Sequence, residues 1–319
     1  MSRMSAYRIL VSDGLAENGL ALLSTAGEVT SNPKISPAEL LETLPDYDAL
    51  VVRSRTKVTP LVIAAGRRLK VIGRAGVGVD NIDIDAALQH GITVVNSPLA
   101  ASIAVAEHTF GLMLSLARMT PAADASMKAG KWEKSAFVGS ELAGKTLGLI
   151  GIGRIGAFVA HLARAFGMQV LAYDPFYSQQ QIREKQAEPA DLEAVVPAAD
   201  YLSLHLPLTS QTRGLLGAEL LGKLKPGARL VCTARGGIVD EDALRAALDA
   251  GTLAGAALDV FACEPAEPGS IATHPKVIAT PHIGAQTKEA QARAGLAIAE
   301  EVVAVLEGRQ PRWRVTAQD

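Results

Sequence analysis

The segment 144–174 constrains the fold of this chain more than any other feature of its sequence. It carries the pattern G-x-G-x-x-G between an apolar, strand-like run and a helical pattern, and a second apolar run then leads to an acidic residue. The three glycines are Gly151, Gly153 and Gly156, and the acidic residue is Asp174. The spacing between the last glycine and this acid is close to the ~20 residues found in dinucleotide-binding motifs. This context predicts a strand–turn–helix–strand unit that binds a dinucleotide.

Each part of this segment has a physical role in holding such a ligand. Gly151 permits a tight turn, Gly153 lets the backbone approach a pyrophosphate, and Gly156 lets helix and strand pack closely. The start of the helix offers free N–H groups to phosphate, and Arg154 adds positive charge there. Asp174 can bind ribose hydroxyls and would repel a 2′-phosphate, so we expect NAD rather than NADP.

Short apolar runs alternate with helical patterns along the rest of the chain, which is typical of βα units and parallel sheets. A length of 319 residues suits two domains of about 150 residues each. A long helical pattern over 287–306 can return to the first domain. We therefore predict an α/β protein with two doubly wound domains that share a cleft, since ligands of such sheets lie beyond the carboxyl ends of the strands.

Composition excludes several classes of function. The net charge is −2 and no basic stripe is visible, so we expect no nucleic-acid partner. The most apolar helical stretch, 103–117, is interrupted by Glu107 and His108, and the chain starts without a signal-peptide pattern, so we expect a cytoplasmic protein that does not contact a membrane. Cys232 and Cys263 form no metal-binding pattern; we expect two reduced, buried thiols and no metal.

Three further segments each place a polar side chain just after a strand-like run: Arg235, Glu264 and His282. Hydride transfer to a 2-oxo acid needs an acid for the carbonyl oxygen, which suits histidine, and a cation for the carboxylate, which suits a guanidinium. A carboxylate beside the histidine would orient it. Taken singly, an arginine in this position is more often a surface or ion-pair residue, a glutamate before proline is usually a loop charge, and the histidine could equally be buried and structural. The coincidence of all three favours a catalytic set.

The segments ARGGIVDEDAL, FACEP and TPHIGAQT, following GIGRIG, resemble the D-isomer-specific 2-hydroxyacid dehydrogenase family over essentially the whole chain. The resemblance implies an NAD-dependent oxidoreductase acting on a small anionic 2-hydroxy or 2-oxo acid. It implies a Rossmann cofactor domain, 100–286, inserted in a flavodoxin-like substrate domain, 1–99 plus 287–319. Arg235 would bind the substrate carboxylate, His282 would be the acid/base and Glu264 its partner.

The same resemblance implies a set of ligand contacts and a homodimer formed through the cofactor domain. The expected cofactor contacts are Gly151, Gly153, Arg154, Ile155, Gly156, Asp174, Pro207, Thr212, Thr233, Ala234, Arg235, Asp259, His282 and Gly284. The expected substrate contacts are Arg53, Ser54, Arg55, Val77 and Gly78, with Arg235 and His282. Of the other histidines, His205 is expected to line the cofactor pocket and His108 to serve packing or a subunit contact.

The segments VVRSRTKV and RAGVGVDNID are most similar to the D-3-phosphoglycerate dehydrogenases within that family, here in a short form without a C-terminal regulatory domain. Arg53 and Arg55 alternate along an extended segment, so both can face a second anion such as phosphate, or form a solvated basic edge. Val77, Ala101 and Cys232 stand where the family often has polar residues. A sulfolactate dehydrogenase, a hydroxypyruvate or glyoxylate reductase, an NAD-sensing corepressor-like binding protein and a hydrolase with tightly held NAD therefore stay open.

Overall fold

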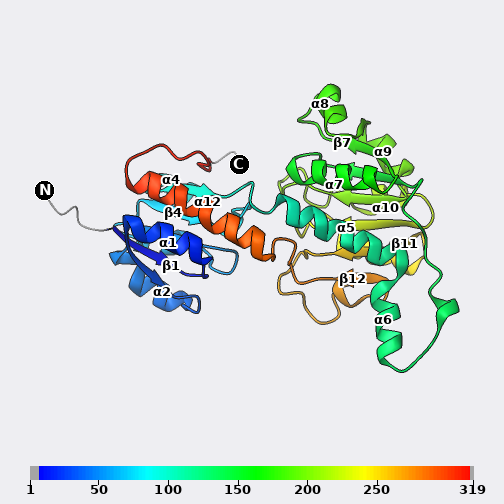
Figure 1. Ribbon diagram of the computed structural model, residues 1–319, viewed down its shortest axis with the longest axis horizontal. Helices are drawn as coiled ribbons and strands as arrows, with labels where there is room; N and C mark the ends of the chain where they lie inside the picture. Colours follow the sequence, from blue (N-terminus) through cyan, green and yellow to red (C-terminus); the bar gives the residue numbers. More distant parts are fainter. Residues whose placement is uncertain (1–6, 317–319) are drawn as a thin grey trace, which may run out of the picture. The chain divides into compact units, whose positions relative to one another are not determined.

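The computed structural model describes residues 7–316, which divide into two compact units, each built on one parallel sheet (Figure 1). Unit 1 comprises residues 7–101 and 286–316, and unit 2 comprises residues 102–285. These bounds lie close to those expected for the two domains. The prediction of an α/β protein with two parallel sheets is confirmed.

Unit 1 holds a five-stranded sheet in the order β2-β1-β3-β4-β5, the flavodoxin-like order. Its strands are β1 (Tyr7–Val11), β2 (Gly27–Ser31), β3 (Ala49–Val52), β4 (Val71–Arg74) and β5 (Thr93–Asn96). Its helices are α1 (Glu17–Ala26), α2 (Pro37–Thr43), the 3-10 helix η1 (Leu44–Asp46), α3 (Pro60–Ala65), α4 (Ile84–Gln89) and α12 (Lys288–Leu306).

Unit 2 holds a seven-stranded sheet in the order β12-β11-β10-β9-β6-β7-β8, which is the Rossmann order with one added strand. Its strands are β6 (Thr146–Ile150), β7 (Gln169–Tyr173), β8 (Glu188–Pro189), β9 (Tyr201–Leu204), β10 (Ala228–Cys232), β11 (Leu253–Leu258) and β12 (Val277–Ala279). Its helices are α5 (Ser102–Arg118), α6 (Thr120–Lys128), η2 (Lys134–Ala136), α7 (Arg154–Ala165), α8 (Gln179–Glu184), α9 (Leu192–Ala198), α10 (Ala218–Gly222), α11 (Glu241–Asp249) and η3 (Ile271–Thr273).

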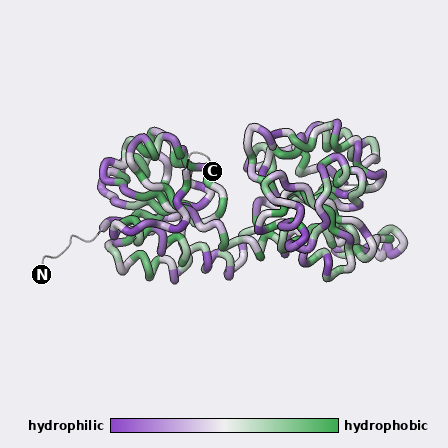
Figure 2. Tube along the Cα trace, turned by 90° about the horizontal axis from the view of Figure 1, so that it is seen from above, coloured by the Kyte–Doolittle hydropathy of each residue, from purple (hydrophilic) through white to green (hydrophobic). Residues whose placement is uncertain are grey.

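The central strands are continuous apolar runs because helices cover both faces of each sheet. Every residue of β3 and of β9 is buried. Figure 2 shows hydrophobic residues along the inner segments of each unit. In unit 1, α12 packs on α1 and β4, and the helices cross so closely that a Cβ at Gly19 would lie 2.6 Å from the Gly295 carbonyl oxygen. The core thus anchors the strand ends that carry the site.

The sequence did not reveal two edge strands, β2 and β8. The first is largely exposed or half-buried and the second has only two residues, so neither carries the apolar run that marks a buried strand. The two apolar runs that flank the glycine loop and its helix are strands as expected, β6 and β7.

Candidate active site

The glycine loop joins β6 to α7 and has the geometry of a phosphate cradle. Gly151 has φ +93°, and a Cβ there would lie 2.5 Å from the His205 carbonyl oxygen. A Cβ at Gly156 would lie 2.4 Å from the Gly151 carbonyl oxygen. Around Gly153, by contrast, no heavy atom lies within 4 Å of that position. Packing within the protein therefore requires glycine at 151 and 156. Gly153 instead leaves open space beside the N-terminus of α7, where a pyrophosphate fits.

Asp174 ties the end of β7 to this loop. One carboxylate oxygen accepts a hydrogen bond from the Ile152 N–H at 2.8 Å, and the other accepts one from the Phe176 N–H at 3.0 Å. Arg154 and Ile155 begin α7 directly after the loop. The acid is thus held half-buried beside the glycine loop.

Arg235, Glu264 and His282 follow three neighbouring strands, β10, β11 and β12. Since these strands are parallel, their carboxyl ends lie at one edge of the sheet. The loops touch there, because a Cβ at Gly236 would lie 1.7 Å from the Phe261 carbonyl oxygen. The sheet topology therefore brings the three loops together at the edge that also carries the glycine loop after β6.

Glu264 and His282 form a hydrogen-bonded pair, with 2.8 Å between Glu264 Oε2 and His282 Nδ1. The other carboxylate oxygen of Glu264 accepts a hydrogen bond from the Phe261 N–H at 3.1 Å. Partial burial raises the pKa of Glu264, but the hydrogen bond and charge of His282, with the Phe261 N–H, outweigh it and hold that pKa below its usual range. An ionised carboxylate only accepts hydrogen bonds, so Nδ1 carries a hydrogen and Nε2 is left for the reactants.

The backbone of His282 has φ +52°, a left-handed conformation that is uncommon for a residue other than glycine. Asp259, only 1% exposed, holds the chain on the C-terminal side of this residue. Its two oxygens accept hydrogen bonds from the Ile283 and Gly284 N–H groups, each at 2.8 Å. The hydroxyl of Thr280, on the N-terminal side, donates to the same carboxylate at 2.6 Å. Asp259 thus fixes the backbone around His282.

His108, on α5, completes this network, since its Nε2 lies 3.3 Å from Asp259 Oδ1 and 3.1 Å from Thr280 Oγ1. Burial raises the pKa of Asp259, but the hydrogen bonds from His108, Thr280 and the backbone lower it to below its usual range. We expected His108 to serve packing or a subunit contact; the structure instead hydrogen-bonds it to the loop of His282. No local pattern signals this role, because the contact depends on how α5 packs against the sheet.

The remaining expected cofactor residues lie in loops of unit 2. Thr109 donates its only hydroxyl hydrogen to the Val105 carbonyl oxygen, so Thr233 must donate to Thr109 across the 2.8 Å between them. Ala234 is buried beside Thr233, and its carbonyl oxygen accepts a hydrogen bond from Arg235 Nη1 at 2.7 Å. In the loop after β9, Thr212 donates to the Pro207 carbonyl oxygen at 2.7 Å. These hydrogen bonds stabilise the conformations of the loops after β9 and β10.

One other expectation for this edge changes with the structure, that for Cys263. His205 is bonded through Nε2 to Ser203 Oγ at 2.9 Å, and burial lowers its pKa to about 4, so its imidazole is neutral at pH 7. Cys232 is buried, as expected, and burial raises its pKa to about 11. The expectation that Cys263 is buried is wrong: this residue is exposed, because it lies in the loop between Phe261 and Glu264.

The substrate residues expected in unit 1 occupy loops after β3 and β4. Arg53 Nη2 donates to Gln286 Oε1 at 3.3 Å, and Ser54 is exposed. The guanidinium of Arg55 forms an ion pair with Asp13 at 3.1 Å and donates to the Ile35 carbonyl oxygen at 3.1 Å. The guanidinium of Arg55 is therefore engaged within unit 1, whereas the sequence led us to expect that both arginines either face a second anion or form a solvated basic edge.

The loop after β4 contains Val77 and Gly78, both half-buried. The Asn96 side-chain amide donates to the Val77 carbonyl oxygen at 2.7 Å and so joins this loop to the end of β5. Ala101, where the family often has a polar residue, is buried. The carboxyl edge of the unit 1 sheet thus carries the expected substrate residues, and the carboxyl edge of the unit 2 sheet carries the residues predicted to be catalytic.

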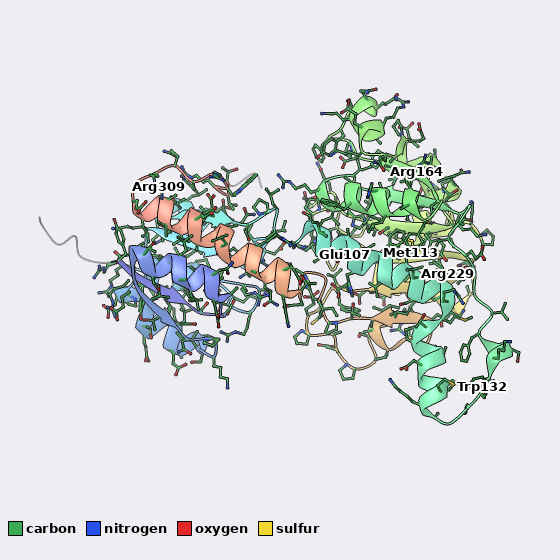
Figure 3. All side chains as sticks on the ribbon, in the orientation of Figure 1. Glu107, Met113, Trp132, Arg164, Arg229 and Arg309 are labelled. Carbon is green, nitrogen blue, oxygen red and sulfur yellow. The ribbon has the colours of Figure 1, made fainter. Side chains whose placement is uncertain are left out.

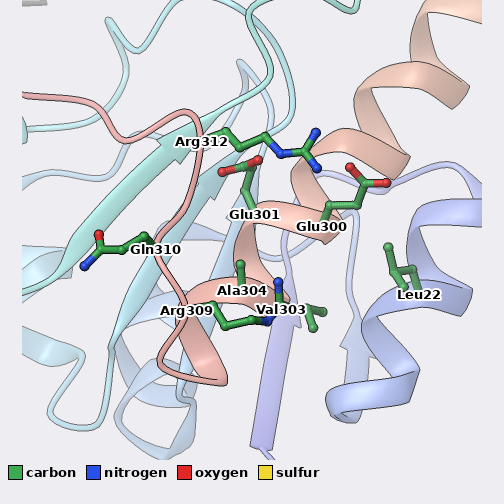
Figure 4. A pocket seen from close by; sticks show the side chains of 8 residues that line it. All are labelled: Leu22, Glu300, Glu301, Val303, Ala304, Arg309, Gln310 and Arg312. Atoms are coloured by element: carbon green, nitrogen blue, oxygen red, sulfur yellow. The ribbon is translucent and has the colours of Figure 1, made fainter.

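Other features of the described residues lie apart from these loops. A pocket beside α12, lined by Leu22, Glu300, Glu301, Arg309 and Arg312 among others, contains none of the predicted site residues (Figure 4). Among residues 7–316, no three His, Cys, Asp or Glu side chains gather as a metal site would require. Across the same range, every helix is too short or too polar to traverse a lipid bilayer.

Comparison with known proteins gives matches over most of the chain. The model of the family "D-isomer specific 2-hydroxyacid dehydrogenase, NAD binding domain" matches residues 110–284. A D-3-phosphoglycerate dehydrogenase of Synechocystis is 46% identical over 97% of this chain and 56% of its own length. The corresponding enzyme of Methanocaldococcus jannaschii is 49% identical over 94% of this chain and 58% of its own length.

A solved structure has a similar fold over nearly the whole chain. The TT0316 protein from Thermus thermophilus matches with a TM-score of 0.88 and 37% identity, covering 97% of this chain and 100% of that one. The chain thus spans a little over half the length of the curated relatives it matches, but the whole of this solved structure.

Proposed function

Because the chain belongs to the D-isomer-specific 2-hydroxyacid dehydrogenase family, we propose that it is an NAD-dependent oxidoreductase that interconverts a small anionic 2-hydroxy acid and its 2-oxo acid. The substrate we propose is D-3-phosphoglycerate, which is oxidised to 3-phosphooxypyruvate. The relatives named above support this choice. The observation that carries the proposal is the His282–Glu264 pair beside the Arg235 loop, at the same sheet edge as the glycine loop.

The residues around the glycine loop fit NAD. Gly153 leaves room for the pyrophosphate at the N-terminus of α7, and Asp174 lies where the ribose hydroxyls would be. Loops 207–212 and 233–235 would complete the contacts. When bound, NAD supplies the nicotinamide ring that accepts a hydride from C2 of the substrate.

The protein's own groups manage the proton and the charges. As the C2–H bond breaks and the carbonyl forms, the hydroxyl proton passes to His282 Nε2; in the reverse direction the same atom returns it. Glu264 keeps Nε2 directed outward and stabilises the positive imidazolium. Arg235 binds the substrate carboxylate and polarises the C2 oxygen through its forked donors. In unit 1, the substrate contacts we propose are Arg53, Ser54, Val77 and Gly78.

The decisive experiment is a screen for NADH formation over phosphoglycerate, sulfolactate, glycerate, lactate and malate. We expect stoichiometric NADH from D-3-phosphoglycerate, and a loss of about 10²–10⁴ in turnover for His282→Ala. If only sulfolactate or only glycerate were turned over, that acid would replace D-3-phosphoglycerate as the proposed substrate, and the family would be unchanged. No NADH from any acid, together with capture of a peptide partner, would favour a corepressor-like binding protein and refute the enzyme.

We also propose a homodimer formed through the cofactor domain. The segment after α6 exposes large apolar side chains: Trp132 is 81% exposed and Val138 is 80% exposed, and Figure 3 shows Trp132 next to α6. Where such side chains gather in one contiguous patch, the patch marks a protein–protein contact. Sedimentation velocity on the wild type and on Trp132→Glu tests this, and a wild-type monomer at micromolar concentration would refute it.

A further inference from the structure

The loop after β3, residues 53–56, is held from both sides by two buried side chains that the reaction does not use. The loop is the one that carries Arg53, and its next residue, Ser54, is exposed. Asp13, at the end of β1, has only 3% of its side chain exposed. Asn81, in the loop that follows β4, is 9% exposed. Both residues reach the same two positions of the loop, Arg53 and Thr56.

Asp13 accepts the loop's hydrogen-bond donors. Its Oδ2 accepts the N–H groups of Arg53 at 2.7 Å and of Thr56 at 3.1 Å. Its Oδ1 accepts the hydroxyl of Thr56 at 2.5 Å and lies 3.1 Å from Arg55 Nη2. Four donors therefore converge on one buried carboxylate, which makes this anion a rigid centre for the loop.

Asn81 supplies the complementary contacts. Its side-chain amide donates to the Arg53 carbonyl oxygen at 2.8 Å and to the Thr56 carbonyl oxygen at 2.6 Å. The N–H and C=O groups of both residues are thus bound by side chains rather than by neighbouring strands. Because Asp13 and Asn81 come from loops after two different strands, the sheet contributes to the conformation of the loop from outside the loop's own sequence.

This arrangement separates the roles of the two arginines. The guanidinium of Arg55 binds Asp13 and donates to the carbonyl oxygens of Ser12 and Ile35, and so anchors the loop. Arg53 is fixed at its backbone, while its guanidinium extends to the exposed side chain of Gln286. A rigid backbone under an arginine that reaches outward is what a bidentate contact to an anion requires, because little freedom is then lost on binding.

We propose that Asp13 and Asn81 are positioning residues that orient Arg53 toward a second anion of the substrate, and so set the preference for phosphorylated over unphosphorylated 2-hydroxy acids. The inference rests on the proposed function. It assigns the preference to Arg53 alone among the two arginines of the loop.

The test compares kcat/KM for D-3-phosphoglycerate and for D-glycerate, which lacks the phosphate. We expect Asp13→Asn and Asn81→Ala each to lower the ratio of these two constants about tenfold, through KM for phosphoglycerate, since a misplacement of ~1 Å can cost up to ~100-fold. Arg53→Ala should lower the ratio at least as much. In the Arg53→Ala background, Asp13→Asn should lower it no further, because both changes remove one contact.

Asp48→Asn is the matched control. Asp48 is also a buried carboxylate of unit 1 that binds a backbone N–H and basic side chains, but it lies before β3, at the other end of the strand. We expect it to lower the thermal midpoint as Asp13→Asn does while leaving the ratio unchanged. Any one of three results would overturn this inference without affecting the proposed function. They are an unchanged ratio in both Asp13→Asn and Asn81→Ala, additive effects with Arg53→Ala, and a wild type equally active on the two acids. A wild type inactive on every 2-hydroxy acid would overturn the proposed function.

Discussion

Replacing Glu264 by Gln removes one charge from the site and leaves its shape almost unchanged. A neutral amide can still accept a hydrogen bond from His282 Nδ1, but it no longer stabilises the imidazolium that forms when the substrate hydroxyl loses its proton. The change therefore measures what the carboxylate contributes to the transition state beyond orienting the ring.

The magnitude follows from the geometry of the pair. At the 2.8 Å between Glu264 Oε2 and His282 Nδ1, two unit charges interact by ~1.5 kcal/mol in bulk water and ~6 kcal/mol at an effective dielectric constant of ~20. The two side chains are 38% and 44% exposed, so solvent screening brings the value toward the lower limit, to about 1.5–3 kcal/mol. We therefore expect turnover to fall about 10–100-fold, at ~1.4 kcal/mol for each tenfold.

The assay is steady-state NADH formation at saturating substrate, with the dissociation constant of NAD measured separately. Glu241→Gln is the control, because Glu241 binds the Ala262 N–H of the same loop at 2.7 Å without being bonded to His282. We expect the control to stay within about twofold of the wild type. Turnover of Glu264→Gln within twofold of the wild type, with unchanged NAD binding, would refute the role of the carboxylate derived above.

Three more predictions concern unit 2. Gly156→Ala should lower stability by about 1–3 kcal/mol, since its Cβ would meet the Gly151 carbonyl oxygen, whereas Gly153→Ala should unfold at the wild-type temperature and weaken only NAD binding; thermal unfolding and calorimetric titration separate the two. Asp174→Ala should lose the preference for NAD over NADP, and an unchanged ratio of kcat/KM values would contradict its assignment to the ribose. The pKa of Asp259 is lowered on folding, so its contribution to stability is present above about pH 4 and is lost as the pH falls through the lowered pKa. Asp259→Asn should therefore make the free energy of unfolding fall less steeply with decreasing pH below about pH 4. A fall as steep as that of the wild type would contradict this.

Local sequence patterns were sufficient for the framework of the fold. The run 146–150 is largely apolar because a parallel strand covered on both faces has little contact with water, and the structure has the strand β6 there. The glycine spacing around Gly151 likewise identifies its turn, because no other residue type suits φ +93° against the carbonyl of His205. Short edge strands such as β2 escape this reasoning, because neither of their faces is fully buried.

By itself, the sequence determined which residue types follow each strand, and so named an arginine, an acid and a histidine as candidates. Only the tertiary structure decided what each of them touches. The order β12-β11-β10 places Glu264 against His282, the packing of α5 brings His108 to Asp259, and the order β1-β3-β4 lets Asp13 and Asn81 hold one loop from two sides. These contacts join residues far apart in the chain, and a pattern read along the chain carries no information about strand order; the distances that give the side chains their chemistry exist only once the sheets have formed.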